Sequence, residues 1–314
     1  MQLRIHMVKH PQILAIIDLG SNSFYMKIVR VLPNGEIVEI IRHKQQIQLR
    51  AGMDANGELT PDIEQKAFAC FRQFAQYLQK YQVDAVRVTG TYTLRKAKRK
   101  GHFLAEGQHI LGYPIQVVSG IEEARLIYVG ATHNSPLDQT HLVVDIGGGS
   151  TELIVGENNC ILASTSLGMG CVSFQNRFFD NGKLTTHQFE QAIQTAKHKL
   201  QRILSKFTRH NAKDFLGSSG TVLTVSNVLE NHIDTCDQTI TRSGLNWLYK
   251  KLLSFKDINH IALNGLREDR IGILPGGFCV LFAIFDCFQI DKMTLSAGGI
   301  REGSLYELIQ ETSG

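Results

Sequence analysis

One short pattern occurs twice in this chain and restricts its fold more than any other feature. An apolar run ends in DLG at residues 18–20, small polar residues follow, and a second apolar run begins at Met26. The same order returns 127 residues later, where DIG at 145–147 precedes the apolar run 153–155. Because two apolar runs joined by a small-residue turn are typical of a β-hairpin, the repeat predicts two domains of related fold. The matched positions are a carboxylate and turn residues: Asp18 with Asp145, Gly20 with Gly147, and Ser23 with Ser150.

The segments between and after the two copies mix helices with strands. Thr60 and Pro61 begin a predicted amphipathic helix that runs to about residue 81, and strands are expected at 83–88 and 115–118. A further helix is expected at 120–129, and the polar, turn-rich stretch 132–140 is the best candidate for a domain boundary. This mixture predicts an α/β architecture, and 314 residues are enough for two domains.

The second half repeats this mixture. An apolar stripe predicts one long helix from Thr186 to about Phe207. GSSGT (217–221) and LPGG (274–277) should each open a helix, and a strand at 293–299 should precede a helix at 301–309. Backbone amides are exposed in such small-residue turns, and exposed amides bind phosphate.

Charge and composition exclude several classes of protein. Lys and Arg outnumber Asp and Glu by 33 to 29, which is too weak a bias to predict binding to nucleic acid or to a membrane. The apolar stretch 278–285 is far too short to cross a bilayer, and the first ten residues do not resemble a secretory signal, so a cytoplasmic location is expected. The six cysteines lack metal-ligand spacing and are expected to be reduced, largely buried thiols without a zinc site.

The two repeated turns carry residues suited to phosphate and metal. Neither a P-loop nor a strand followed by GxGxxG occurs. In DIGGGSTE, three glycines let the backbone approach an anion, while Asp145 and Glu152 offer hard oxygen ligands for magnesium. DLGSNS offers the same parts, and the alternative is two ordinary hairpin turns. The expected phosphate-binding residues are Gly20, Ser21, Asn22, Ser23, Gly147, Gly148, Gly149 and Ser150.

Together with SGIEEARLIY (119–128), TYTLR (91–95), GSSGT, ILPGG and GIREGSLYEL, these turns make nearly the whole chain resemble one family. It is the family of exopolyphosphatases and guanosine pentaphosphate phosphohydrolases, within the superfamily of sugar kinases, actin and Hsp70. The resemblance implies two ribonuclease-H-like domains with the active site in the cleft between them. We expect the first domain to span 1–131 plus a returning helix at 300–314, and the second to span 132–299.

Two adjacent glutamates are candidates for the base that activates water. Glu122 and Glu123 point about 100° apart on a helix and so cannot share one role. Ser119 and Glu122 fit a capping box in which Glu122 folds back onto the cap, which leaves Glu123 for catalysis. The resemblance agrees, because the second glutamate of this pair is the family's proposed general base. The alternative is that Glu123 is a solvated first-turn carboxylate.

Arg95 begins the densest basic run of the chain, which extends to residue 100. Such a run is usually a solvated face, but the resemblance implies that Arg95 contacts the substrate phosphate. The lysines beyond it could guide a polyanion inward. Arg267, Arg270 and Arg301 occur near small-residue turns, and their roles stay open.

The sequence also departs from the family pattern. Long members continue into a helical HD-like domain that helps to hold long substrates, whereas this chain stops after GSLYELIQETSG. It is therefore expected to be a short form that does not degrade very long polyphosphate processively. Tyr25 occupies a position where histidine is common.

These observations favour a hydrolase that removes the terminal phosphate of inorganic polyphosphate or of guanosine pentaphosphate, with Mg²⁺ as cofactor. Asp145, Glu152 and Asp18 are the expected metal ligands, Glu123 the base, and Arg95 the residue that stabilises charge. The alternatives are a small-molecule kinase of the same superfamily and a non-catalytic sensor of polyphosphate or alarmone. A homodimer is expected because symmetric dimers are the commonest soluble homo-oligomers.

Overall fold

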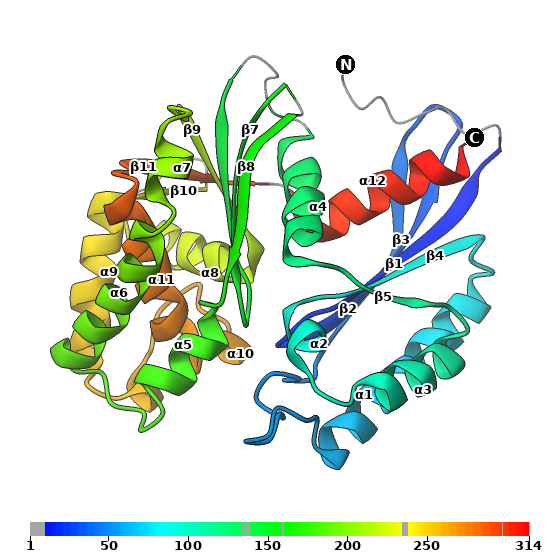
Figure 1. Ribbon diagram of the computed structural model, residues 1–314, viewed down its shortest axis with the longest axis horizontal. Helices are drawn as coiled ribbons and strands as arrows, with labels where there is room; N and C mark the ends of the chain where they lie inside the picture. The colour runs from blue at the N-terminus through cyan, green and yellow to red at the C-terminus, as the bar shows by residue number, and fades with distance from the viewer. Residues whose placement is uncertain are drawn as a thin grey trace. The chain divides into compact units, whose positions relative to one another are not determined.

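Both repeated turns connect the two strands of a hairpin, as the sequence predicts (Figure 1). In the computed structural model, β1 (Gln12–Leu19) pairs antiparallel with β2 (Ser23–Val31). In the second half, β6 (His141–Ile146) pairs antiparallel with β7 (Thr151–Glu157). The register places Asp18 opposite Tyr25 and Asp145 opposite Glu152, so the carboxylates of Asp145 and Glu152 lie on the same face of their sheet.

The structure describes residues 10–133, 135, 139–158, 160–233, 238–296 and 298–313. The expectation for the N-terminal segment before residue 10 lies outside these residues, as do Cys236 and part of the expected boundary at 132–140. None of the described helices is long and apolar enough to span a membrane.

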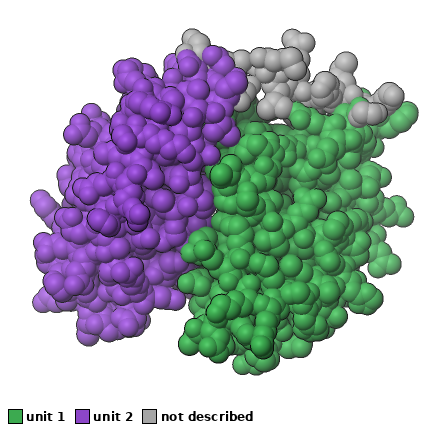
Figure 2. Space-filling model, in the orientation of Figure 1, with its two compact units in different colours: residues 1–133, 300–314 green, residues 134–299 purple. Residues whose placement is uncertain are grey.

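The chain divides into two compact units, which Figure 2 distinguishes by colour. Unit 1 consists of residues 1–133 and 300–314, and unit 2 of residues 134–299. Unit 1 is thus built from two separate stretches of sequence, and unit 2 from one.

Unit 1 contains a mixed five-stranded sheet in the order β3-β2-β1-β4-β5, in which β1 pairs parallel with β4. Its remaining strands are β3 (Ile37–Gln46), β4 (Ala85–Gly90) and β5 (Ile115–Val117). Its helices are α1 (Pro61–Lys80), α2 (Tyr92–Lys96), α3 (Gly101–Leu111), α4 (Gly120–Thr132) and α12 (Ile300–Thr312). Thr60 takes the N-cap position of α1 as predicted, although its side chain makes no capping hydrogen bond.

Alternation along β1 decides which groups meet on each face of this sheet. Ala15 and Ile17 lie in the core cluster that includes the phenylalanines of α1 and α3. Leu14 and Ile16 lie in a second cluster that includes Leu305 and other side chains of α12. Asp18 follows Leu14 and Ile16 in this alternation, so its side chain lies on the face that α12 covers.

Unit 2 contains a six-stranded sheet in the order β10-β11-β9-β6-β7-β8, so its order from β8 to β11 repeats that of unit 1. Its other strands are β8 (Cys160–Leu167), β9 (Asp214–Ser218), β10 (Thr239–Thr241) and β11 (Lys292–Leu295). The longer helices are α5 (Cys171–Phe178), α6 (Thr186–Gln201), α8 (Ser219–Glu230), α9 (Arg242–Phe255) and α11 (Leu274–Cys287). The short elements are α7 (Leu204–Thr208), α10 (Glu268–Ile271) and a 3₁₀ turn, Ile258–His260.

The apolar stripe predicted as one helix in this half forms two. Helix α6 ends at Gln201, and α7 begins at Leu204 after Ile203 takes a non-helical φ of −121°. Phe207 is nonetheless buried in the core of unit 2 with Phe189 and Leu200, so the burial prediction was right although helix continuity was wrong.

The prediction that the cysteines are largely buried is confirmed in part. Cys70, Cys171 and Cys279 are free and buried, whereas Cys160 is free and exposed on β8. Burial raises the pKa of Cys70 to about 12. No group of three or more His, Cys, Asp or Glu side chains that could hold a metal ion occurs among the residues the structure describes.

Candidate active site

The turn between β1 and β2 is held by the segment that follows β3. The amides of Ile47 and Gln48 donate to the carbonyl of Asn22 at 3.1 and 2.8 Å, and the amide of Arg50 donates to the carbonyl of Ser21 at 3.0 Å. In a trans peptide the C=O and N–H point in opposite directions. The amides of Asn22 and Ser23 therefore point away from this segment, in the orientation that an anion would need.

The equivalent turn in unit 2 is held by the first turn of α5. The amide of Cys171 donates to the carbonyl of Gly147 at 2.9 Å, and the amides of Val172 and Ser173 donate to the carbonyl of Gly148 at 3.0 and 3.1 Å. These bonds satisfy helix amides that have no partner within α5. By the same peptide geometry, the amides of Gly148 and Gly149 are directed away from α5.

Gly170, the N-cap of α5, lies directly against this turn. A Cβ at Gly170 would lie 2.4 Å from the carbonyl carbon of Gly148 and 2.5 Å from the amide nitrogen of Gly149. Only glycine permits such an approach without displacing the turn. The sequence reasoning missed Gly170, although the pair of glycines at 168 and 170 was a visible signal.

The GSSGT segment fixes the end of β6. Ser219 has a positive φ of 87° and its hydroxyl donates to the carbonyl of Ile146 at 2.9 Å, while Thr221 donates to the same carbonyl at 2.8 Å. GSSGT opens α8 as predicted. Its hydroxyls hold the strand next to Asp145, a role that the sequence did not indicate.

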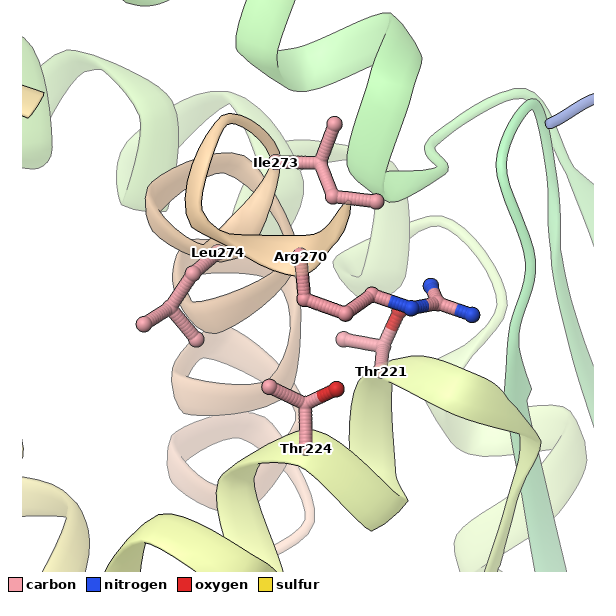
Figure 3. Close-up of a pocket in the computed structure, with 5 residues that line it drawn as sticks. All are labelled: Thr221, Thr224, Arg270, Ile273 and Leu274. Carbon is pink, nitrogen blue, oxygen red and sulfur yellow. The ribbon is translucent and has the colours of Figure 1, made fainter. Parts of the chain in front are cut away.

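Arg270 covers the first turn of α8. One of its Nη atoms would lie 2.2 Å from a Cβ on Gly220, so the guanidinium rests on that glycine. Figure 3 shows the side chain extending past Thr221 over a small hollow, which Thr224, Ile273 and Leu274 also line. Arg267 instead pairs with Asp269 at 2.9 Å near the surface.

Helix α4 brings the predicted base into contact with the predicted phosphate-binding arginine. The Ser119 hydroxyl accepts a hydrogen bond from the amide of Glu122 at 3.1 Å, which confirms the predicted cap. Glu123, in the first turn, is 7% exposed, and its Oε2 accepts from Arg95 Nη1 at 2.5 Å. Arg95 also donates to the carbonyl of Val118 at 3.1 Å.

The expected return of Glu122 onto its own cap was wrong. The Glu122 carboxylate accepts two hydrogen bonds from Arg125, at 2.9 and 2.7 Å. A bidentate guanidinium three residues along the helix binds a carboxylate more strongly than a single backbone amide does. The two glutamates differ instead in their surroundings, since Glu122 lies near the surface and Glu123 is buried.

Helix α2 connects this pair to the turn of unit 1. Thr93 is 1% exposed and donates to the hydroxyl of Ser21 at 2.7 Å. Thr93 and Arg95 lie two residues apart on α2, so one short helix contacts both the turn and Glu123. In the basic run that follows, Lys100 donates to the carbonyl of Arg95 and Arg99 pairs with Glu58.

Asp18 lies at the end of β1 and pairs with Arg301, the second residue of α12. Arg301 Nε is 3.0 Å from Asp18 Oδ2, and the guanidinium carbon lies 3.9 Å from the ring centre of Tyr25. Burial raises the pKa of Asp18 above its usual value, and the charge and hydrogen bond of Arg301 oppose that shift.

Asp145 and Glu152 fit a hard metal ion in chemistry and position. They are direct cross-strand partners, 9% and 1% exposed, and Ser166 donates to Glu152 Oε1 at 2.7 Å. Magnesium commonly binds one or two carboxylates and fills its remaining positions with water and substrate phosphate. Two adjacent buried carboxylates beside an amide-lined turn suit that mode of binding.

These features define a class of protein. Two units with the same strand order, each with a small-residue turn after its first strand, belong to the fold class of actin and the Hsp70 ATPases. This agrees with the α/β fold that the resemblance implied.

Comparison with known proteins identifies the family within this class. The model of the Ppx/GppA phosphatase family matches residues 28–312, and the chain belongs to that family. A putative exopolyphosphatase of Haemophilus influenzae is 39% identical over 295 residues, covering 94% of this chain and 91% of that one. A guanosine-5'-triphosphate,3'-diphosphate pyrophosphatase of Vibrio cholerae is 40% identical over 297 residues, covering 95% of this chain but 59% of its relative.

Solved structures support the same fold. An exopolyphosphatase from Cytophaga hutchinsonii superposes with a TM-score of 0.86 at 23% identity, covering 96% of this chain and 98% of that one. The Aquifex aeolicus PPX-GPPA enzyme superposes with a TM-score of 0.77 at 20% identity, covering 95% and 99%. Phosphatases of this family are generally dependent on a divalent metal.

Proposed function

We propose that this protein hydrolyses the terminal phosphoanhydride of inorganic polyphosphate and releases orthophosphate, with guanosine pentaphosphate as the other candidate substrate. The names of the Haemophilus and Vibrio relatives support both substrates. Each substrate ends in the same phosphoanhydride, so the same turns can bind either.

The observation that carries this proposal is the cluster around α2. A buried carboxylate, Glu123, is held by Arg95 on a helix that also contacts the phosphate-binding turn through Thr93. A hydrolase needs a base for its attacking water and a kinase can use one for its acceptor hydroxyl, whereas a sensor needs neither. The cluster within unit 1 therefore favours catalysis over sensing, and the names of the relatives favour hydrolysis over transfer.

The roles follow from the groups available. The outward amides of the two turns would bind phosphate oxygens, and Arg95 would stabilise the charge on the phosphoryl group as it is transferred. Glu123 would accept a proton from the attacking water as the oxygen of that water bonds to the terminal phosphorus. The bond between this phosphorus and the bridging oxygen then breaks, the bridging oxygen stays on the shortened substrate, and orthophosphate is released.

We propose magnesium as the metal, held by Asp145 and Glu152. When bound, it supplies positive charge that offsets the negative charge of the phosphate oxygens. Removal of the metal with EDTA should abolish phosphate release, and added Mg²⁺ should restore it.

The decisive experiment replaces Glu123 by Gln, which keeps the size of the side chain and one acceptor for Arg95. Glu123→Gln should bind polyphosphate normally and release orthophosphate about 10²–10⁴-fold more slowly, since a general base typically contributes that much. Glu122→Gln is the matched control, because Glu122 is adjacent but binds Arg125 near the surface, and it should retain activity. Turnover of Glu123→Gln within a few-fold of wild type would refute the assignment.

The substrate, the oligomeric state and the cellular location each need a separate measurement. Orthophosphate release should be compared on short polyphosphate, long polyphosphate and guanosine pentaphosphate, and a phosphorylated acceptor formed from ATP would indicate a kinase instead. We propose a homodimer, which light scattering tests. We also propose a cytoplasmic location, where the free thiols would stay reduced.

A further inference from the structure

Asp18 and Asp145 occupy equivalent positions in the two units, yet their surroundings differ. Asp145 lies beside a second carboxylate, Glu152, across the strand pair. Asp18 lies opposite Tyr25, and its Oδ2 is 3.0 Å from Arg301 Nε. The repeated sequence therefore places one aspartate beside an anion and the other beside a cation.

A guanidinium at this distance makes Asp18 a poor metal ligand. Its positive charge repels a divalent cation, and its Nε–H already engages Oδ2, one of the two carboxylate oxygens that could bind a metal. The Asp18 side chain is largely shielded from water at 11% exposed and that of Arg301 is partly exposed at 36%, so this interaction is less screened than one between two fully exposed side chains.

Arg301 is held in a defined orientation next to the turn. Its Nε is fixed by Asp18 and its plane rests on Tyr25 with the guanidinium carbon 3.9 Å from the ring centre. The other oxygen of Asp18, Oδ1, lies 3.9 Å from the Cβ position of Gly20, the first residue of the phosphate-binding turn. The Asp18 carboxylate thus lies between the turn and the Nε of Arg301.

The two Nη groups of Arg301 are the donors that Asp18 does not use. A guanidinium that binds a carboxylate through Nε still presents Nη–H groups in a fixed plane, and that geometry suits phosphate oxygens. Arg301 lies on α12, more than 200 residues from Arg95 in sequence, and on the face of the sheet that α12 covers.

From this arrangement we propose that Arg301 binds the substrate phosphate in the reaction proposed above, and that Asp18 orients Arg301 instead of binding the divalent metal. Asp18 is then a positioning residue that acts through the arginine, and Asp145 and Glu152 are the carboxylates that serve the metal. This inference rests on the proposed function for its substrate, but its test requires no turnover.

The test measures two binding equilibria in Asp18→Asn, Arg301→Gln and the double variant. Binding of sodium tripolyphosphate is measured by calorimetry in EDTA, and binding of Mn²⁺ by the electron paramagnetic resonance signal of the free ion. Asp18→Asn and Arg301→Gln should each weaken tripolyphosphate binding about tenfold or more, and the double variant should bind no more weakly than Arg301→Gln. All three should bind Mn²⁺ within about twofold of wild type, whereas Glu152→Gln should lose Mn²⁺ affinity.

Two controls separate a specific effect from loss of charge or fold. Arg42→Gln removes an exposed arginine of the same unit, which pairs with Glu39, and should leave tripolyphosphate binding unchanged. Arg301→Lys keeps the charge but not the planar donors, and it should also bind more weakly, with an unchanged thermal midpoint.

A tenfold loss of Mn²⁺ affinity in Asp18→Asn would overturn the proposal, as would unchanged tripolyphosphate binding in Arg301→Lys. Failure of the wild-type protein to release orthophosphate would instead refute the proposed function, and these binding results would still stand.

Discussion

Replacement of Gly170 by alanine tests whether the position of the glycine-rich turn in unit 2 controls activity. The backbone of Gly170, with φ −111° and ψ 168°, is one that alanine adopts without strain, so the only cost is steric. The added Cβ would lie 2.4–2.5 Å from three backbone atoms of Gly148 and Gly149, whereas ordinary contact begins at 3.4 Å. The turn and α5 must therefore separate by about 1 Å.

This displacement should reduce both activity and stability. A shift of about 1 Å in a positioning group can cost about 10²-fold in rate, so kcat/KM for polyphosphate should fall by about that factor. Overpacking typically costs about 1–3 kcal/mol, and each kcal/mol lowers Tm by about 2–4 °C in a domain of this size. Orthophosphate release and calorimetry measure the two effects on the same preparation.

Gly272→Ala is the matched control in the same unit. A Cβ there meets nothing within 4 Å, and the backbone φ of −66° and ψ of −4° suit alanine. Its activity and Tm should equal or slightly exceed those of wild type. If Gly170→Ala kept kcat/KM within twofold of wild type, the reasoning that ties turn position to catalysis would be refuted.

Two further predictions concern single hydrogen bonds. Thr93→Val removes the hydroxyl that donates to Ser21, and because one hydrogen bond contributes about 0.5–1.5 kcal/mol, KM for polyphosphate should rise about 2–10-fold. Thr93→Ser should restore the wild-type KM. An unchanged KM in Thr93→Val would contradict this role. The hydrogen bond with His141 holds the pKa of Asp214 in the folded protein below its usual 3.8. Ionised Asp214 therefore stabilises the folded state above pH 3.8, and this stabilisation is lost as the pH falls through the lower pKa that Asp214 has in the folded protein. The Tm difference between wild type and Asp214→Asn should therefore narrow from about pH 5 to about pH 3, and a constant difference would show that the pair does not contribute through ionisation.

Local patterns in the sequence were sufficient to predict the strands that flank the two repeated turns and several of the helices. Apolar runs joined by small-residue turns predicted the two hairpins, and periodic apolar residues predicted α1. The segments GSSGT and LPGG predicted the starts of α8 and α11. The strands β3 and β8 were missed because each lies at the edge of its sheet. Edge strands are only half buried and therefore lack a strong apolar signature.

Contacts between distant residues could not be read from local patterns. Asp18 and Arg301 are 283 residues apart, and nothing in either motif indicates that they pair. Ser219 adopts a positive φ, although serine gives no sequence signal for that conformation. The Arg95–Glu123 pair was predicted only in part: the motifs that carry the two residues were recognised, but the contact between them was not foreseen.

The division of unit 1 into two stretches of sequence sets an order on biosynthesis. Unit 2 is continuous, so the ribosome adds all of its residues before it adds any residue of α12. The face of the first sheet that bears Leu14, Ile16 and Asp18 stays uncovered until those last residues emerge. Asp18 can therefore pair with Arg301 only after the whole of unit 2 has been synthesised, so the first sheet, although it is made earlier, gains this helix later.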